Sequence, residues 1–255
     1  MTDVLLLNAG AIVGLMLIVW LISLPLHDAS IIDLVWGAGF VVVAWMTFFA
    51  RLAEPRSLLL PVLTTIWGVR LSAYLAWRNH GKPEDYRYRS MRERNGSRFP
   101  FVSLLTVFAL QGAIMWLVSL PLQTAGAPVP ERAWFRWTGI AVWATGAFFE
   151  SVGDWQLACF KSDRSNQGHV MDRGLWRYTR HPNYFGDFCV WWGLYFVALG
   201  CGAPWWCVIG PTVMSVFLTK VSGVTLLEKT LIETRPEYAD YVRRTNAFFP
   251  GQPKP

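Results

Sequence analysis

The sequence predicts an all-α integral membrane protein that crosses the bilayer about seven times. Of its 255 residues, 53% are apolar and only 16% are charged, which is too few charges to cover a soluble domain of this length. Apolar stretches near the length that a transmembrane helix needs, ~20 residues, also follow one another along most of the chain. Because no block between them is large enough to bury its own core, we expect one multi-pass membrane domain over residues 1–255.

Seven stretches meet or nearly meet the required length. The expected spans are Val4–Leu26, Ser30–Ala50, Leu58–Trp77, Phe101–Leu122, Trp134–Ala158, Asn183–Gly202 and Pro204–Val221. The first span has no basic stretch before it and no Ala-x-Ala-type cleavage site, so we interpret it as a retained helix and not as a signal peptide. Only Gly200–Pro204 separates the last two spans, and this segment could instead be a kink in one helix.

The basic residues orient these helices. Eighteen of the 23 Lys and Arg residues fall in three segments: between the third and fourth spans, between the fifth and sixth, and from Lys220 to the C-terminus. With seven spans all three segments lie on one side, and the positive-inside rule places that side in the cytoplasm and the N-terminus outside. We therefore expect a multi-pass membrane location, in the inner membrane if the chain is bacterial.

The net charge of +6 follows from the same rule and from contact with anionic membrane lipids. Nucleic acid is not an expected partner, because the basic residues are spread over three segments around apolar helices. The four cysteines form no Cys-x-x-Cys pair and the four histidines are far apart, so no metal site is predicted. The sequence does not decide the oligomeric state, and a monomer is compatible with it.

Several polar side chains fall inside or at the edge of the apolar stretches, where a bare charge costs ~2.5–3.5 kcal/mol or more. They could form internal pairs, such as Asp33 with Arg70, or lie at the level of the lipid head groups. As a set they favour a polar cavity open to the cytoplasmic side. The residues are Asp33, Arg70, Gln111, Glu150, Asp154 and Asp187.

The segment from Lys161 to Asp187 concentrates cations, aromatic rings and amides in 27 residues next to a helix start. Guanidinium and ammonium groups both suit phosphate oxygens. Pro182 suits a first helical turn, whose free N–H groups also attract an anion. The simpler interpretation is a basic cytoplasmic loop with interfacial aromatic rings.

The string Arg180-His181-Pro182-Asn183-Tyr184-Phe185-Gly186-Asp187, preceded by Gly174-Leu175-Trp176-Arg177-Tyr178, resembles the C-terminal domain of steroid 5α-reductases and their bacterial relatives. The resemblance is strongest over residues 150–187 and extends over most of the chain. On the third expected helix Arg70 and Tyr74 match an Arg and a Tyr, and Asn79-His80-Gly81-Lys82-Pro83 matches an Asn-Arg-Gly-Arg-Pro-like turn. Leu110-Gln111-Gly112 on the fourth also fits.

The resemblance implies a seven-helix reductase that uses NADPH to transfer a hydride to the β-carbon of an enone. The implied substrate is a 3-oxo-Δ4-steroid or another lipid enone. Asp154, Lys161, Asn183 and Asp187 fall where the family carries residues that bind NADPH. The residues expected to bind this cofactor are Arg70, Asn79, Lys82, Asp154, Lys161, Arg164, Tyr178, Arg180, His181, Asn183, Tyr184, Asp187 and Glu228.

The catalytic positions depart from the family. A Glu on the second helix and a Tyr on the third hold the substrate ketone there, and the matching residues here are Asp33 and Trp67. Asp33 can donate a hydrogen bond if burial keeps it protonated, whereas Trp67 can donate only its indole N–H. Tyr74 is a further candidate proton source. The expected catalytic residues are therefore Asp33, Trp67 and Tyr74.

Two other classes remain open. Membrane methyltransferases of the isoprenylcysteine and phospholipid type, which use S-adenosylmethionine, also carry Arg-His-Pro-x-Tyr here. They end with a Glu-Glu pair where this chain has Glu228-Lys229. A transporter or scaffold would also tolerate buried charges, but no inverted repeat is visible. In residues 222–255, the cytoplasmic tail, Glu228–Phe249 is expected to be an amphipathic helix leading into an extended stretch, and Glu228 is a candidate to close over the cofactor.

Overall fold

The computed structural model describes residues 1–51, 57–126, 129–221 and 237–254, and contains no strand among them. The chain divides into two compact units, each described by itself. Unit 1 comprises Met1–Trp134 and Val197–Gly210, and unit 2 comprises Phe135–Phe196 and Pro211–Pro255. The expected all-α class is confirmed for the described residues, and the single membrane domain stays a prediction.

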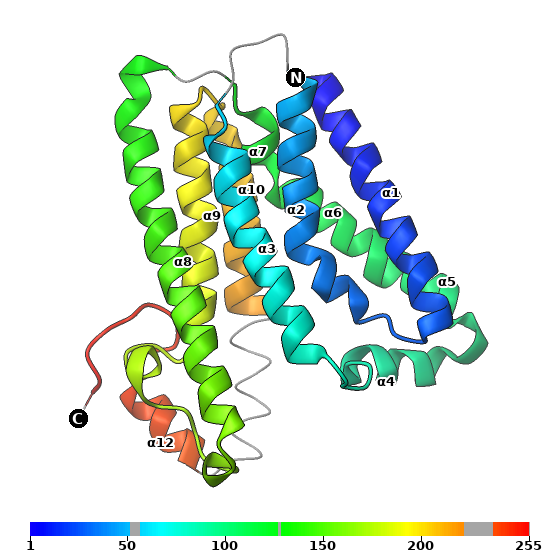
Figure 1. The fold of residues 1–255 in the computed structure, drawn as a ribbon, viewed down its shortest axis with the longest axis vertical. Helices are drawn as coiled ribbons and strands as arrows, with labels where there is room; N and C mark the ends of the chain where they lie inside the picture. The colour runs from blue at the N-terminus through cyan, green and yellow to red at the C-terminus, as the bar shows by residue number, and fades with distance from the viewer. Residues whose placement is uncertain (52–56, 127–128, 222–236, 255) are drawn as a thin grey trace. The chain divides into compact units, whose positions relative to one another are not determined.

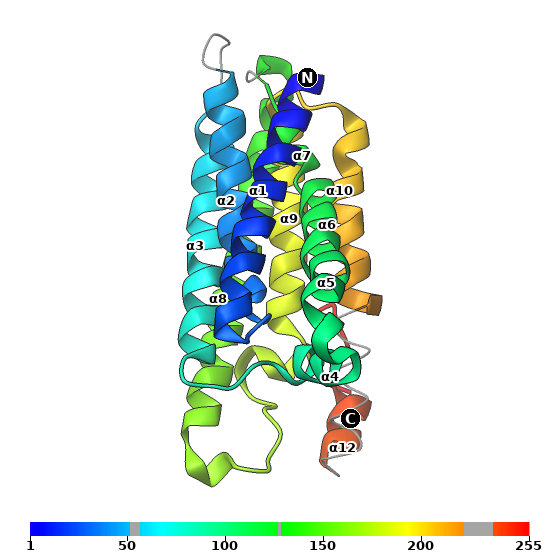
Figure 2. The same cartoon turned by 90° about the vertical axis from the view of Figure 1, so that its right-hand side faces the viewer.

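Unit 1 begins with three long helices, of which α2 lies beside both α1 and α3 (Figures 1 and 2). Short helices follow them. The elements are α1 Thr2–Leu26, α2 Ile31–Ala50, α3 Leu59–Asn79, α4 Tyr86–Asn95, η1 Gly96–Arg98, α5 Phe99–Ser103, η2 Leu104–Ala109, α6 Leu110–Val118, α7 Leu120–Thr124, η3 Pro130–Arg132 and η6 Trp205–Val208. At the crossing of α2 and α3, a Cβ on Gly68 would lie 2.5 Å from the carbonyl oxygen of Gly37, so only glycine lets these backbones touch.

The fourth expected span, Phe101–Leu122, is helical but interrupted. It consists of α5, the π-helical turn η2, α6 and α7. Helix α6 ends at Val118, and the new turn begins at Leu120 beside Pro121. Proline has no N–H to continue the hydrogen-bond ladder, and a π-turn inserts an extra residue into it. A hydropathy profile alone indicates neither the break at the proline nor the π-turn.

Among the described residues, four helical stretches are long and apolar enough to cross a membrane: Thr2–Leu26, Ile31–Ala50, Leu59–Asn79 and Tyr86–Val118. The first three agree with the expected spans to within two residues at each end. Helix α8 has 30 residues but carries Arg136, Glu150, Asp154 and Lys161. By length and composition, the chain is a membrane protein with several apolar helices.

Unit 2 is built on two long helices, α8 and α9, which lie side by side (Figures 1 and 2). Helix α9 starts at Pro182, as expected for a residue that suits a first turn. It ends at Gly200, and the chain turns at Gly202 with φ 79°, so the expected break before Pro204 is confirmed. The elements are α8 Ala133–Ser162, η4 Arg164–Asn166, η5 Gly174–Arg177, α9 Pro182–Gly200, α10 Ile209–Val216, η7 Phe217–Val221 and α12 Glu237–Arg244.

The crossing of α8 and α9 is a backbone contact. A Cβ on Gly146 would lie 2.5 Å from the carbonyl oxygen of Gly186 and equally close to the backbone nitrogen of Val190. A Cβ on Gly193 would meet the backbone of Trp143 at 2.5 Å. No side chain fits at these points, because backbone atoms cannot move aside as a flexible side chain can.

A carboxylate ties α4 to the start of α2 in unit 1. Glu84 accepts hydrogen bonds from Arg92 Nη2 at 2.8 Å and Nε at 3.1 Å, and from the backbone N–H of Ala29 at 2.8 Å. Burial alone would raise the pKa of Glu84, but the hydrogen bonds from Arg92 and Ala29 outweigh it and hold the pKa below its ordinary value of 4.5. The charged form of Glu84 therefore stabilises the fold.

The glycine crossing predicts a large stability loss on substitution. Gly146→Leu should lower the free energy of unfolding by about 1–3 kcal/mol or more, because the new side chain has no room. The thermal midpoint of the detergent-solubilised chain measures this loss. Gly10→Leu is the matched control, since nothing lies within 4 Å of a Cβ on that helical glycine. Equal midpoints for the two variants would contradict the backbone contact.

The contacts of Glu84 predict that replacing it lowers the stability of the fold by an amount that depends on pH. A group with a lowered pKa contributes stability above its ordinary pKa and loses it as the pH falls through the folded value. Glu84→Gln should therefore cost about 1–3 kcal/mol at pH 7, and this difference should shrink below pH 4.5. Thermal midpoints across this pH range test it. Glu93→Gln, at an exposed position of α4, should change little, and a Glu84→Gln loss of the same size at every pH would argue against the charged contact.

Candidate functional site

In unit 1, Asp33 on α2 is part of a polar cluster with Arg87 and Tyr88 of α4. Tyr88 donates its hydroxyl hydrogen to Asp33 Oδ1 at 2.9 Å, and Arg87 Nη2 donates to Asp33 Oδ2 at 3.0 Å. Gln111 Nε2 of α6 donates in turn to the Tyr88 hydroxyl at 3.2 Å. The Tyr88 side chain is buried. Three helices thus meet at one carboxylate and one phenol.

This cluster gives Asp33 a different role from the expected one. Both of its oxygens accept hydrogen bonds, so the arrangement suits the carboxylate and not a protonated donor. The group with a proton to donate is Tyr88. Because Arg87 also contacts Asp33, the hydroxyl of Tyr88 could turn to another acceptor without leaving the carboxylate unpaired.

Trp67 and Tyr74 lie on α3, in different surroundings. Trp67 is fully buried, with its ring 5.8 Å from that of Phe40. Tyr74 is half-buried, and the guanidinium groups of Arg70 and Arg78 each lie 5.9 Å from the centre of its ring. Arg70 is therefore beside Tyr74, as residues four apart on a helix should be.

The two remaining expected residues of unit 1 lie where α3 ends. Asn79 is the last residue of the helix, and its side-chain oxygen accepts a hydrogen bond from Arg78 Nε at 3.2 Å. Its carbonyl accepts from the N–H of Lys82 at 3.0 Å, across a turn in which Gly81 has φ 69°. Left-handed backbone favours glycine, so this residue fixes the turn. Lys82 itself is exposed.

In unit 2, buried acids of α8 face the start of α9. Glu150 and Asp154 are both buried although they carry carboxylates. Asn183 Nδ2 donates to Asp154 Oδ1 at 3.2 Å, so two residues expected to bind the cofactor lie in contact. The Gly146–Gly186 contact lies about one turn from Glu150 and Asn183 and about two turns from Asp154. Gly153, next to Asp154, also approaches the backbone of Asn183, which brings these polar groups close.

Around this pair, His181 and Tyr184 stack with ring centres 5.4 Å apart and planes 5° from parallel. Asp187 lies half-buried one turn further along α9. The acids, the amide and the two rings lie within about one helical turn of the contact between Asp154 and Asn183, and are called the polar group of α8 and α9. Such a group can bind amides and hydroxyls, since it offers both acceptors and donors.

Arg180 has a different set of contacts. Its side chain is buried, and Nη1 donates to the carbonyl oxygen of Val242 at 3.1 Å and to that of Thr245. Its backbone N–H donates to Asn246 at 2.9 Å. These contacts satisfy carbonyls at the C-terminal end of α12, where cations are favoured. Arg180 thus attaches the tail to the loop before α9.

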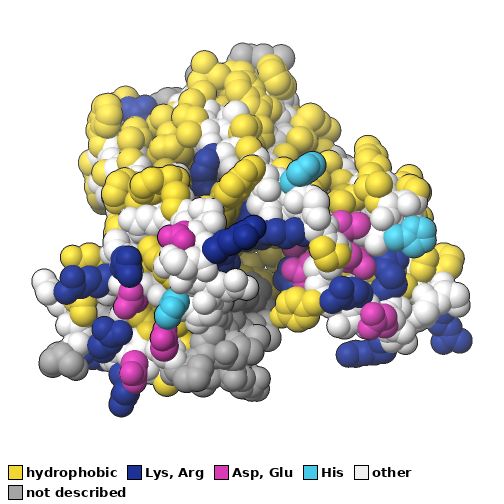
Figure 3. Space-filling model, turned by 60° about the horizontal axis from the view of Figure 1, so that its bottom comes forward, with side chains coloured by type: hydrophobic (Ala, Val, Ile, Leu, Met, Phe, Trp, Pro, Cys, Tyr) yellow, Lys and Arg dark blue, Asp and Glu magenta, His cyan; other side chains and the backbone are white. Residues whose placement is uncertain are grey.

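The other expected cofactor residues of unit 2 are exposed. Lys161 lies in the last turn of α8, Arg164 starts η4 and Tyr178 follows η5. Figure 3 shows basic and acidic side chains interspersed on the face that it draws. Glu228 lies outside the described residues, as does its neighbour Lys229.

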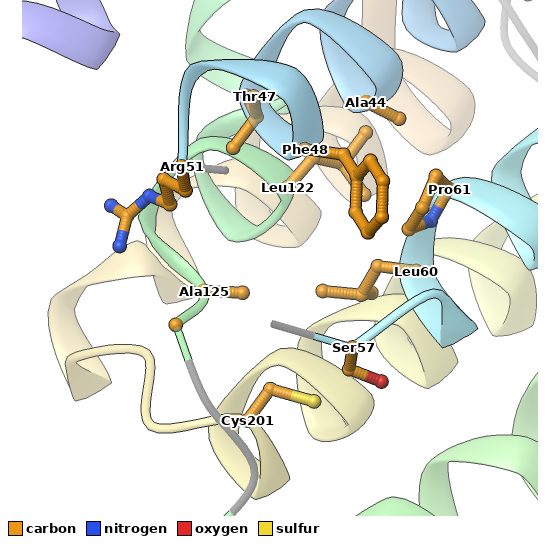
Figure 4. A pocket seen from close by; sticks show the side chains of 11 residues that line it. Ala44, Thr47, Phe48, Arg51, Ser57, Leu60, Pro61, Leu122, Ala125 and Cys201 are labelled. Carbon is orange, nitrogen blue, oxygen red and sulfur yellow. The ribbon is translucent and has the colours of Figure 1, made fainter. Parts of the chain in front are cut away.

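A small pocket lies at the other end of α2, away from Asp33. It is lined by side chains of α2, α3 and α7, among them Phe48, Leu60 and Leu122, and Figure 4 shows the Arg51 guanidinium directed away from them. Its volume of about 30 Å³ holds one or two waters but no cofactor. None of the expected site residues lines it.

Tyr88 is the functional candidate that sequence reasoning missed. For residues 84–98 the sequence indicates only a basic segment, whereas the structure contains helix α4 there, with Asp85 accepting a hydrogen bond from the N–H of Arg87 as its N-cap. An Asp followed directly by a run without Gly or Pro was the available signal for this helix. Nothing in the spacing indicates that Tyr88 meets Asp33, because 55 residues separate them.

Comparisons with known proteins agree with a membrane family of unassigned activity. The chain is 24% identical over 278 aligned positions to an uncharacterized protein of Schizosaccharomyces pombe, covering 94% of this chain and 79% of that protein. No solved structure matches the chain. A family model described as "Protein of unknown function (DUF1295)" matches residues 19–245. The chain therefore belongs to this DUF1295 family, which is related to steroid 5α-reductase-like membrane proteins.

Proposed function

We propose that the protein is an NADPH-dependent membrane reductase that saturates the C=C bond of a lipid enone, with 3-oxo-Δ4-steroids as the substrate class. The observation that carries this proposal is the hydrogen bond between Asn183 and Asp154 within the buried polar group of α8 and α9. Both residues occupy positions at which steroid 5α-reductases bind NADPH. Membership of a family related to such reductases supports the same conclusion.

The residues present fit this cofactor. Its carboxamide and ribose hydroxyls need donors and acceptors in a protected place, which Asp154 and Asn183 offer. Its phosphates need cations, which Lys161 and Arg164 supply at the end of α8. When bound, NADPH supplies the hydride that the β-carbon of the enone receives.

Tyr88 is proposed to stabilise the substrate. Hydride addition leaves negative charge on the ketone oxygen, and a fixed hydrogen-bond donor at that oxygen lowers the barrier. The buried hydroxyl of Tyr88 is such a donor, with Gln111 donating to its oxygen and Asp33 accepting its hydrogen in the free protein. Asp33 is then a positioning residue for Tyr88. Trp67 stays a candidate for the wall of the substrate site, and Tyr74 stays a candidate proton source.

The proposal includes the topology expected from charge. Four spans correspond to the stretches that are apolar enough by composition, and α8, α9 and α10 with η7 would add three more. Seven spans leave the N-terminus outside and the three basic segments in the cytoplasm. A bilayer location gives a lipid substrate direct access, and the enzyme would act as a multi-pass protein of the inner membrane in a bacterium.

Tyr88→Phe tests the reaction and the role of the phenol together. Detergent-solubilised protein with 4-deuterated NADPH and a 3-oxo-Δ4-steroid should give the saturated ketone carrying one deuterium, detected by mass spectrometry. Tyr88→Phe should lower kcat by about 10²- to 10³-fold with little change in KM, since one donor at the oxyanion is lost.

Tyr86→Phe is the control, because its side chain is 63% exposed and only two residues away. It should keep the rate of the unchanged protein. No deuterated product from any lipid enone would overturn the reductase, whereas full activity of Tyr88→Phe would remove only the role given to Tyr88.

A further inference from the structure

The molecule has a second polar site in unit 2, formed by α12, the residues around η5 and the end of the chain. This basic groove has a volume of about 630 Å³. Its lining includes four cations, Arg173, Arg177, Arg244 and Lys254, together with Tyr241 and Thr245. None of the residues assigned to the cofactor or to the substrate lines it.

Backbone hydrogen bonds fix the walls of the basic groove. The N–H of Gly251 donates to Tyr178 at 3.0 Å, and the N–H of Lys254 donates to Arg244 at 2.8 Å. Buried Tyr241 donates its hydroxyl to the carbonyl oxygen of Trp176, which joins α12 to η5. The cations are therefore brought together by the fold and not by a ligand.

Within the part of the chain that the structure describes, these cations have little negative charge around them. Arg244 lies 3.7 Å from Asp172, a single carboxylate. Among the described residues, no acid pairs with the side chain of Arg173, Arg177 or Lys254. Cations gathered on one groove repel one another, and this arrangement is stable when an anion binds between them.

Phosphate is the anion that these groups recognise best, because guanidinium forks match two of its oxygens at once. The groove is much larger than a free phosphate and falls in the size range of sites for organic ligands. It also lies close to the start of α9, next to aromatic rings of the kind found at membrane surfaces. Tyr178 is 43% exposed and Phe249 is 61% exposed.

From this geometry we propose that the basic groove binds the phosphate of an anionic phospholipid head group. The lipid would attach the tail and the loop before α9 to the membrane surface, and each basic residue near such a surface adds to the attraction. This site is separate from the proposed reductase chemistry and does not depend on it.

The test uses the full chain in detergent and short-chain dioctanoyl phosphatidylglycerol as the probe. Its binding should raise the thermal midpoint and give an apparent Kd. The Arg173→Ala/Arg177→Ala variant should weaken this binding about tenfold or more, and Lys254→Ala should weaken it about threefold to fivefold. The matched control, Arg94→Ala/Arg98→Ala, removes the same charge from exposed positions of α4 and η1 and should bind as the unchanged chain does.

Three further ligands identify the source of the phosphate. Dioctanoyl phosphatidylcholine and inorganic phosphate should each bind at least about tenfold more weakly than phosphatidylglycerol. NADPH should bind equally to the unchanged chain and to Arg173→Ala/Arg177→Ala. The proposal is wrong if inorganic phosphate binds as well as the lipid, if the groove variant weakens NADPH, or if the control variant loses as much lipid binding as the groove variants.

Discussion

The contact between the backbones of α8 and α9 at Gly146 and Gly186 is the constraint on which the proposed cofactor group depends. At this crossing the two helices are as close as helices can be, since neither glycine has room for a Cβ. The next two turns of α8 then carry Glu150 and Asp154, and the neighbouring turn of α9 carries Asn183. Burying a carboxylate costs free energy. Because the two helices are close, the amide of Asn183 can donate a hydrogen bond to Asp154 and offset part of that cost.

In unit 1 a partly buried carboxylate is stabilised by a separate short helix, α4. Asp33 lies near the start of an apolar helix, and α4 supplies both groups that hydrogen-bond to it, Arg87 and Tyr88. The position of α4 depends in turn on Glu84, whose carboxylate joins Arg92 to the N–H of Ala29. A chain of polar contacts therefore runs from the loop before α2 to the buried phenol. Since each contact orients the next, the ring of Tyr88 is held in place, and its hydroxyl hydrogen is free to turn from Asp33 to a substrate ketone.

Much of the fold is contained in local sequence signals. Runs of apolar residues predict α1, α2 and α3 closely, and Pro182 and Gly200–Pro204 correctly mark the two ends of α9. The interruption between Phe101 and Leu122 was missed, because a π-turn has no distinct composition and depends on how neighbouring helices pack. For the site, resemblance to a family suggested Asp154 and Asn183, which do lie in contact. The partners of Asp33 and of Arg180 are more than 50 residues away from them in sequence, so only the folded chain identifies them.

The cofactor is the central claim, and direct binding tests it best. Tryptophan-to-NADPH energy transfer in the solubilised chain should saturate with NADPH and be unaffected by S-adenosylmethionine. Asp154→Asn should weaken NADPH at least about tenfold, as loss of a hydrogen bond to a charged group does. Asp3→Asn makes the same change at an exposed position of α1, outside all the residues assigned to the cofactor, and should leave NADPH binding unchanged. Saturable binding of S-adenosylmethionine without binding of NADPH would contradict the account and favour a methyltransferase.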